Sequence, residues 1–325
     1  MPIKSLRGSE LGYDPLSREI AFYGQRYSID HTAIPRARGR DYYVSSVIGN
    51  AGSTGKSIDD AVTTLALAVT KVTAGQGDRI ILLEGHAETI SSATALTLSK
   101  AGVEIIGLGR GANRPTFTLD TGTDTTINIT ANRVTIRNVI FSANFADIVS
   151  FFTITTAKSF QLIGCRFQAT ATNMNSLYVV DTNATTNDCD GLSITSCEWV
   201  EPDLATVGWI KMDGTNDNVV FNDNYCNLGV QNNKSLITVA NGKVVTNLQM
   251  LRNRTIRLNT DTATGALLFH TDGSTNSGIV ADNYSQHADT AAELIVTASS
   301  GLSLFDNKSS GVNGNSGYII ATVDS

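Results

Sequence analysis

A short pattern recurs from residue 104 onward and restricts the possible folds more than any other feature. Each copy has an apolar residue, two variable residues, one special position, another variable residue and a final residue. The copies are EIIGLG (104–109), TIRNVIF (135–141), QLIGCRF (161–167), SITSCEW (193–199), VFNDNYC (220–226), QMLRNRT (249–255), IVADNYS (279–285) and SLFDNKS (303–309). Their mean spacing is about 28 residues, the length of one structural repeat. Because one such strand unit cannot bury a hydrophobic face alone, the copies must stack on one another.

The special position changes its chemistry along the chain. Its residues are Gly109, Val139, Cys165, Cys197, Asn224, Asn253, Asn283 and Asn307. In a parallel β-helix, equivalent residues of successive coils lie about 4.8 Å apart, and an asparagine amide can donate to one neighbour and accept from the other. We therefore predict an asparagine ladder over Asn224, Asn253, Asn283 and Asn307, continued by Val139, Cys165 and Cys197. Two residues further on, Phe141, Phe167 and Trp199 predict an aromatic stack.

The residues before the repeats divide into two segments. Residues 1–41 follow neither a period of 2 nor one of 3.6, which predicts an extended arm. Residues 42–78 contain an entry strand, a glycine-rich turn and the capping-box-like start SIDD (57–60), followed by Ala61, Leu65, Ala68 and Val69 at helical spacing. We therefore predict an all-β protein, a single-stranded parallel β-helix of about eight or more coils over residues 79–325, preceded by a capping helix and an arm.

The stretch GNAGSTGKS (49–57) invites comparison with a phosphate-binding loop. Such a loop needs four residues between its glycine and the Gly-Lys pair, but five separate Gly49 from Gly55, and Asn50 stands where the glycine should be. It also needs a βαβ context, which a β-helix does not supply. We interpret the stretch as the turn before the capping helix.

Composition narrows the class of protein further. No apolar run approaches the roughly 18 residues of a membrane span, and the polar start MPIKSLRGSE predicts no secretory signal, so we expect synthesis in a host cytoplasm. Cys165, Cys189, Cys197 and Cys226 lack zinc-site spacing, which predicts free, buried thiols, with a Cys165–Cys197 disulfide as the alternative. We predict no membrane partner, no cofactor and no metal.

Charge is unevenly distributed between the arm and the body. Residues 1–40 hold seven basic and four acidic side chains, whereas the whole chain carries a net charge of −6. The acidic body argues against nucleic acid as a partner. A solvated linker and docking on an acidic protein surface both fit the basic arm. The docking prediction names Arg18, Phe22, Tyr23, Arg26, Tyr27, Arg36, Arg38 and Arg40.

Two longer stretches resemble a known family. They are DYYVSSVIGNAGSTGKSIDDAVTTLALAVTKVTAGQGDRIILLEGHAETI (41–90) and GVEIIGLGRGANRPTFTL (102–119). They are similar to the entrance of right-handed, pectate-lyase-like β-helix proteins of tailed bacteriophages, which include capsid decoration proteins, head fibres and tail spikes. The resemblance implies a right-handed helix and, by family habit, a homotrimer.

Enzymatic alternatives were weighed against this resemblance. Asn259-Thr-Asp261 matches one element of polygalacturonase-like hydrolases, but the paired Asp motif, Gly-His-Gly and Arg-x-Lys are absent. Asp213, Asp217 and Asp223 are the densest candidates for a lyase calcium site, although such clusters are mostly turns. His31, His86, His270 and His287 form no sequence motif. We therefore predict no catalytic residues.

The leading hypothesis is a non-enzymatic capsid decoration protein on the capsid exterior of a virion, bound to the major capsid protein through its arm. The alternatives are a tail spike or head fibre that binds a glycan, with Tyr178, Trp209 and Tyr284 as candidate exposed aromatics, and a polysaccharide depolymerase. The last alternative assigns catalysis to Asp213, Asp223 or Asp261.

Overall fold

The computed structural model separates the chain into two compact units, Met1–Arg38 and Gly39–Ser325. The described residues are 11–14, 19–22, 25–28, 39–171, 173–183, 185–230, 235–257, 266–271, 275–287, 294–296, 301–311 and 317–318. The first unit contains three antiparallel strands, β1 (Leu11–Asp14), β2 (Glu19–Phe22) and β3 (Gln25–Ser28). The role of this segment as a docking arm stays a prediction.

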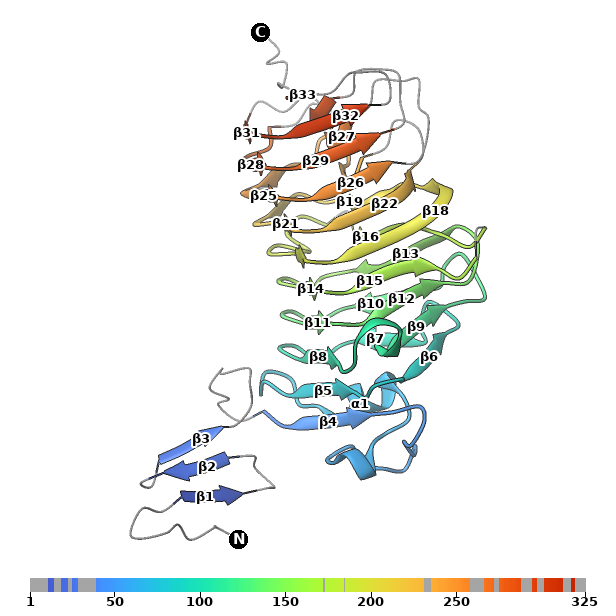
Figure 1. Cartoon of the computed structure of the whole chain (residues 1–325), viewed down its shortest axis with the longest axis vertical. Helices are drawn as coiled ribbons and strands as arrows, with labels where there is room; N and C mark the ends of the chain where they lie inside the picture. Colours follow the sequence, from blue (N-terminus) through green and yellow to red (C-terminus); the bar gives the residue numbers. More distant parts are fainter. Residues whose placement is uncertain are drawn as a thin grey trace. The chain divides into compact units, whose positions relative to one another are not determined.

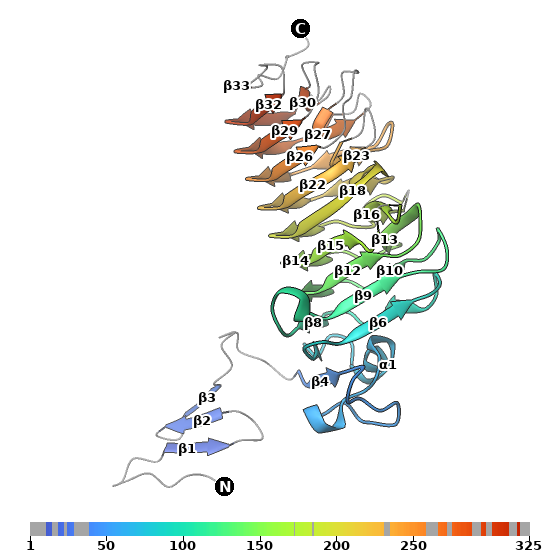
Figure 2. The ribbon, with the colours of Figure 1, turned by 45° about the vertical axis from the view of Figure 1, so that its right-hand side comes forward.

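The second unit is a stack of coils whose strands form three sheets (Figures 1 and 2). Sheet 1 contains β4 (Asp41–Val44), β5 (Arg79–Leu82), β8 (Glu104–Gly107), β11 (Thr135–Arg137), β14 (Gln161–Ile163), β17 (Ser193–Thr195), β21 (Val220–Asn222), β25 (Leu248–Leu251), β28 (Gly278–Ala281) and β31 (Leu302–Phe305). Sheet 2 contains β6 (Ala87–Ile90), β9 (Thr116–Leu119), β12 (Ile140–Ala143), β15 (Arg166–Ala169), β18 (Glu198–Thr206), β22 (Tyr225–Val230), β26 (Arg254–Arg257), β29 (Tyr284–His287), β32 (Lys308–Gly311) and the antiparallel β33 (Gly317–Tyr318).

Sheet 3 contains β7 (Leu96–Leu98), β10 (Ile127–Ile129), β13 (Ile148–Ile154), β16 (Ser176–Thr182), β19 (Gly208–Met212), β23 (Ile237–Val239), β27 (Ala266–Thr271) and β30 (Leu294–Val296). A further pair, β20 (Asn216–Asp217) and β24 (Val245–Thr246), joins two coils between sheets 3 and 1. Apart from β33, every strand of the stack pairs in parallel with its neighbours. The prediction of an all-β parallel β-helix is therefore confirmed, while its coil number and its N-terminal cap stay predictions.

The entry segment forms less helix than the sequence pattern predicts. A short 3₁₀ turn, η1 (Ile58–Asp60), precedes the helix α1 (Leu65–Lys71), whose N-cap is Thr64 rather than Ser57. The Thr64 hydroxyl accepts the Leu67 amide, whereas Ser57 makes no side-chain cap. Leu65, Ala68 and Val69 are buried, so the helix packs through the predicted face. The glycine-rich turn closes on itself, because the Gly55 amide donates to the Asp60 carbonyl at 2.8 Å.

A left-handed residue turns the chain from sheet 1 into sheet 2 in seven coils, at Asn138, Gly164, Ser196, Asp223, Arg252, Asp282 and Asp306. The residue that follows each of them occupies the predicted ladder position. Asn224, Asn253 and Asn283 each donate a side-chain hydrogen bond to the next asparagine, at 3.1, 2.9 and 2.8 Å. These asparagine side chains are buried, which leaves no accessible glycosylation acceptor among them.

The interior beside this corner is aromatic in the earlier coils. Phe117, Phe141 and Phe167 stack, with ring centroids 5.8 and 5.4 Å apart, and Phe167 pairs in register with Trp199. Trp209 is 0% exposed and meets Phe167 and Trp199 edge-on, so its predicted exposure is wrong. It turns inward because β19 is irregular: the amides of Trp209 and Ile210 both donate to the Leu236 carbonyl. All four cysteines are free and buried.

The corner between sheets 3 and 1 has asparagines of its own that the repeat search did not reveal. The Cys189 amide donates to Asn216 Oδ1 at 3.0 Å, and the Val245 amide donates to Asn276 Oδ1 at 2.6 Å. Asp188 lies beside Cys189 and is 1% exposed. This second corner therefore also uses side-chain amides to satisfy buried backbone groups.

Candidate functional site

The three aspartates that the sequence groups together lie in three different environments. Asp213 follows β19 on sheet 3 and binds Lys211, while Asp217 accepts hydrogen bonds from Thr246 and Asn247 at the second corner. Asp223 occupies the left-handed corner and pairs with Arg252 through two hydrogen bonds of 2.7 and 2.8 Å. They do not form a shared cation site. Within the described part of the chain, no group of three or more His, Cys, Asp or Glu side chains is placed to hold a metal ion.

Asp213 instead belongs to a cluster on sheet 3 that we name the Lys211 cluster: Tyr178, Asp181, Lys211 and Asp213. Asp181 and Lys211 are register partners on β16 and β19. Tyr178 and Asp181 are three residues apart and would alternate to opposite faces of a regular strand. In β16, however, both intervening residues, Val179 and Val180, are fully buried, so Tyr178 and Asp181 flank an inward-facing pair and both stay partly exposed.

One ammonium group links the two carboxylates of the cluster. Lys211 Nζ lies 3.3 Å from Asp181 Oδ1 and 2.6 Å from Asp213 Oδ2. The side chains of Asp181, Asp213 and Lys211 are 17, 31 and 35% exposed, so solvent reaches the cluster without fully hydrating it. The Asp213 amide donates to the Thr182 hydroxyl at 3.2 Å, which ties the end of β19 to the preceding coil.

Protonation equilibria in the cluster are shifted in a direction that favours retained protons. Burial raises the pKa of Asp181, and the nearby Lys211 only partly offsets it. Burial also raises the pKa of Tyr178 to about 12, and the charges of Asp181 and Asp213 act in the same direction. For Lys211, burial acts against the charged amine, but the hydrogen bond to Asp213 and both carboxylate charges outweigh it and raise the pKa.

The Asp223–Arg252 pair shows what an ordinary surface ion pair does in this fold. Its side chains are 43 and 53% exposed, and the hydrogen bonds from Arg252 lower the pKa of Asp223. Asp181 shifts the opposite way although it too contacts a cation. A partly buried carboxyl group with a raised pKa beside a second carboxyl group is typical of acid–base sites. We therefore take the Lys211 cluster as the candidate site.

Hydroxyl groups surround the cluster along sheet 3. Thr153 pairs in register with Asp181, and its Oγ1 lies 3.0 Å from Thr126 Oγ1 and 3.2 Å from Ser150 Oγ. On the other side, Thr238 pairs in register with Lys211, and its buried Oγ1 has no hydrogen-bond partner among the described residues. The next strand, β27, places His270 opposite Thr238 in the backbone register.

His86 is positioned for structure rather than for chemistry. Its Nδ1 accepts the Ser46 amide at 2.9 Å, and its Nε2 lies 3.3 Å from Glu88 Oε2. Glu88 in turn accepts the Leu65 amide at the start of α1. The imidazole is 1% exposed and packs edge-on against Phe117, so it fixes the turn that carries it.

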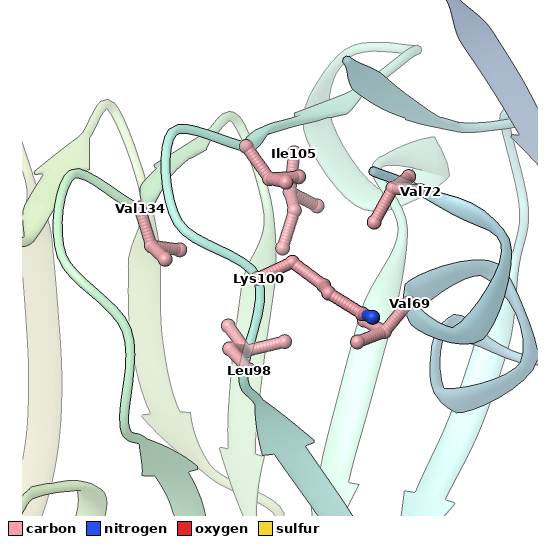
Figure 3. A pocket seen from close by; sticks show the side chains of 7 residues that line it. Val69, Val72, Leu98, Lys100, Ile105 and Val134 are labelled. Atoms are coloured by element: carbon pink, nitrogen blue, oxygen red, sulfur yellow. The ribbon is translucent and has the colours of Figure 1, made fainter. Parts of the chain in front are cut away.

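A small cavity lies between α1 and the first coils (Figure 3). It is lined by Val69, Val72, Leu98, Lys100, Val103, Ile105 and Val134, and the Lys100 side chain extends toward Val69. Its volume is about 10 Å³, which is room for about one water molecule. The cavity is a packing gap in an apolar junction, and it includes no member of the Lys211 cluster.

The residues predicted for docking are placed only in part. Arg18, Tyr23, Arg36 and Arg38 lie outside the described residues, as do His31, Asn259 and Asp261. Phe22 belongs to β2, and Arg26 and Tyr27 belong to β3, with their backbone positions alone described. The Arg40 amide donates to Asp78 Oδ1 at 2.8 Å, which connects the start of β4 to the start of β5. No helix in the described part of the chain is long and apolar enough to cross a membrane.

The topology defines the class of fold as a parallel β-helix built from three sheets. No protein-family model matches the chain, and no curated protein matches it. Among solved structures it is similar to a GH136 lacto-N-biosidase from Eubacterium ramulus, with a TM-score of 0.47, 12% identity, and coverage of 84% of this chain and 68% of that one. It is also similar to a rhamnogalacturonan lyase, with a TM-score of 0.46, 11% identity, and coverage of 87% of this chain and 90% of that one. A third similar structure is an alginate lyase from Paenibacillus sp., with a TM-score of 0.37, 12% identity, and coverage of 83% of this chain and 98% of that one.

These structures correct the functional prediction made from sequence. Their names describe a glycosidase and two polysaccharide lyases, and none of them describes a virion protein. The hypothesis of a non-enzymatic capsid decoration protein is therefore withdrawn, and with it the prediction that the chain is not an enzyme. Because the likeness at 11–12% identity concerns the fold, the chemistry of this chain is argued from its own side chains.

Sequence reasoning found one member of the cluster for its chemistry and missed the others. Asp213 was considered as a calcium ligand together with Asp217 and Asp223, and also as one of the candidate catalytic residues of a depolymerase. Tyr178 was considered only as an exposed aromatic. A usable signal was present: YVVD (178–181) and GWIK (208–211) belong to strands about one repeat apart, and aligning them places Lys211 beside Asp181.

Proposed function

We propose that this protein is a carbohydrate-active enzyme that cleaves glycosidic bonds at the Lys211 cluster. The observation that carries the proposal is the partly buried Asp181, with its raised pKa, next to Lys211 and the second carboxylate Asp213. Glycoside hydrolysis uses such a pair, one carboxyl group as proton donor and one as base or nucleophile. Of the three hypotheses drawn from the sequence, this one develops the polysaccharide depolymerase.

Each side chain takes a role that follows from its protonation. Asp181, whose pKa is raised by burial, donates its proton to the glycosidic oxygen as the bond to the anomeric carbon breaks. Asp213 accepts the proton of the attacking water or attacks the anomeric carbon, and the anomer of the product distinguishes these two routes. Lys211 holds both carboxylates in place. Tyr178 stays protonated at physiological pH and can donate a hydrogen bond to a sugar.

The test is a screen of polysaccharides for new reducing ends, with the wild-type protein compared with Asp181→Asn and Asp213→Asn. We expect each variant to lose activity by about 100-fold or more, the scale of general acid–base catalysis. Asp223→Asn, whose carboxylate lies in an exposed ion pair away from sheet 3, serves as the control and should keep full activity. Absence of product from every polymer, or unchanged activity in both variants, would contradict the proposal. Unsaturated sugars as the product would replace hydrolysis by elimination.

The pH dependence gives a second test of Asp181. Because burial raises its pKa above the ordinary value of 3.8, the proton donor stays loaded at higher pH than a free aspartate. Activity should fall as pH rises through the pKa of Asp181 in the folded protein. We expect the residual activity of Asp181→Asn no longer to fall over this pH range. A limb that persists in the variant would assign the proton donor elsewhere.

Other sequence-based predictions are carried forward without a site. Assembly into a homotrimer and binding of residues 1–41 to an acidic protein surface remain proposals, which light scattering and deletion of the arm would test. The major capsid protein as partner and the capsid exterior as location were predicted together with the corrected function and stay untested.

A further inference from the structure

We infer that the glycan taken by the Lys211 cluster is neutral, built from hexoses or N-acetylated amino sugars rather than uronic acids. The inference rests on the proposed function and deepens it, because it names the substrate class of the same site. Two independent features of sheet 3 carry it: the distribution of charge and the row of hydroxyl groups beside the cluster.

The described strands of sheet 3 hold no spare positive charge for an acidic sugar. Lys211 is the only lysine or arginine within the strands of sheet 3, and its ammonium group already contacts Asp181 and Asp213. Even with Asp181 protonated, Lys211 and Asp213 cancel each other. A polyuronate carries one carboxylate on every sugar, and each would approach a site with no excess cation and up to one excess negative charge.

The side chains around the cluster match neutral sugars. On one side, the hydroxyl of the partly exposed Thr153 lies 3.0 Å from that of Thr126 and 3.2 Å from that of Ser150, and both of these partners are buried. On the other side, Thr238 keeps a buried hydroxyl with no partner among the described residues. A hydroxyl group both donates and accepts, as sugar hydroxyls do, so the Thr153 hydroxyl can exchange these contacts for contacts with a hexose. Tyr178 adds a protonated phenol to the same face.

Sheet 2 shows what the same fold offers when cations are available. Register pairing places a column of charged and aromatic residues on its outer face: Arg166, Glu198, Tyr225, Arg254, Tyr284 and Lys308. The Arg254 guanidinium lies 5.8 Å from the centre of the Tyr284 ring. This column has three cations and one carboxylate, an excess of positive charge that suits a polyanion. The Lys211 cluster has one cation and two carboxyl groups. The neutral assignment is therefore specific to the Lys211 cluster.

The experiment compares polymers that differ only in their carboxyl groups. Polymannuronate and polygalacturonate are each used in native form and after chemical reduction of the carboxyl groups, which leaves linkage and length unchanged. Glucan, galactan, xylan and chitooligosaccharides complete the neutral set. Initial rates are measured with the wild-type protein, and dissociation constants with Asp181→Asn. We expect at least a tenfold preference for the neutral member of each pair, and a smaller preference at high salt because screening weakens repulsion.

The possible outcomes separate the two proposals. Cleavage or binding of a polyuronate at least equal to that of its reduced form would overturn the neutral assignment, while loss of that cleavage in Asp181→Asn would leave the enzyme proposal standing. Binding of neutral glycans without cleavage would support the assignment and overturn the enzyme proposal. No cleavage and no binding across the whole set would overturn both.

Arg254→Ala is the matched control for location. Its side chain lies on the outer face of sheet 2, and removing it should leave rates and dissociation constants unchanged. Loss of glycan binding in Arg254→Ala but not in Asp213→Asn would place the glycan on sheet 2 and overturn the inference.

Discussion

Two stretches of this β-helix build the same corner from different side chains. Up to Cys197, the position after the left-handed residue is occupied by Val139 and two cysteines, whereas from Asn224 onward it is occupied by asparagines. The backbone is the same in both stretches, with φ of 61° at Gly164 and 54° at Arg252. The comparison teaches that the corner geometry belongs to the backbone of the coil, and that the side chain only has to satisfy the buried polar groups nearby.

The hydrogen bonds to one backbone carbonyl, at equivalent positions of successive coils, show how the two stretches differ. Asn253 Nδ2 donates to the Phe221 carbonyl at 2.7 Å, and Asn224 Nδ2 donates to the Ile194 carbonyl at 3.0 Å. In the earlier stretch, the Cys165 thiol lies 3.6 Å from the corresponding Ile136 carbonyl. A thiol is a weaker donor than an amide, so the earlier corner is held less by hydrogen bonds.

In the earlier coils, packing of aromatic side chains in the interior compensates for the weaker hydrogen bonds at the corner. Sheet 2 contributes Phe117, Phe141, Phe167 and Trp199 to the core of the earlier coils, then Cys226, Thr255 and Ser285 at the same register positions. Large rings supply dispersion and hydrophobic burial, whereas small polar residues supply little of either. The Lys211 cluster joins β16, which follows the corner of Cys165, to β19, which follows the corner of Cys197, so it lies just before the first asparagine corner.

The largest effect that would sharpen this comparison is expected for Asn253→Leu. The substitution removes the acceptor of the Asn224 amide and one of the two acceptors of its side chain, which keeps only the Ile194 carbonyl. It also removes the side-chain donor to the Phe221 carbonyl. At roughly 1–3 kcal/mol for each buried unsatisfied group, the free energy of unfolding should fall by about 3–6 kcal/mol. Urea denaturation measures the change. Asn173→Leu, at an exposed position, is the control and should change stability by less than about 0.5 kcal/mol.

Phe141→Ala tests the earlier stretch in the same way. Its ring contacts Phe117, Phe151, Phe152 and Phe167, so truncation opens a cavity in the aromatic core. We expect a loss of about 3–5 kcal/mol in the free energy of unfolding. Phe305→Ala removes a ring that is 58% exposed and should change stability by less than about 0.5 kcal/mol. Equal effects of the two substitutions would refute the assignment of stability to the aromatic stack.

Asp188 tests the second corner through pH. Its carboxylate is 1% exposed, and burial raises its pKa above the ordinary value of 3.8. The folded state therefore binds this proton more tightly than the unfolded state, so the contribution of Asp188 to stability is present below pH 3.8 and is lost as pH rises through its folded-state pKa. Asp188→Asn should be more stable than the wild type above that window. Thermal unfolding across pH measures the difference, and a wild-type protein that gains on the variant as pH rises would refute it.

Cys197→Asn is expected to change the free energy of unfolding least, and it tests most directly whether the two stretches are interchangeable. Asn224 Oδ1 already accepts the Cys197 amide at 2.9 Å, so an asparagine amide at position 197 could bond to the same oxygen as in the later steps. If the corner belongs to the backbone, the free energy of unfolding should change by no more than about 1 kcal/mol. Cys197→Leu, which is larger and cannot bond, is the comparison variant. A loss of several kcal/mol for Cys197→Asn would show that the two stretches are not interchangeable.

The sequence predicted those features that repeat with the coil. The spacing of the eight copies was enough to predict parallel strands and the positions Asn224, Asn253, Asn283 and Asn307, because a one-coil period leaves a direct trace in the chain. It failed where a local irregularity breaks the pattern. The helix begins at Leu65 rather than near Ala61, because Thr64 caps it, and Trp209 turns inward at the irregularity of β19.

The candidate site was out of reach of the sequence for the same physical reason. Its members come from two coils, and the consecutive buried residues Val179 and Val180 place Tyr178 and Asp181 on either side of an inward-facing pair. Repeat length and ladder chemistry are set by each coil and its nearest neighbours, so the sequence by itself determined the parallel β-helix. Charge balance and partial burial depend on which side chains the stacked coils bring together, so only the tertiary structure decided that Lys211 joins two carboxylates.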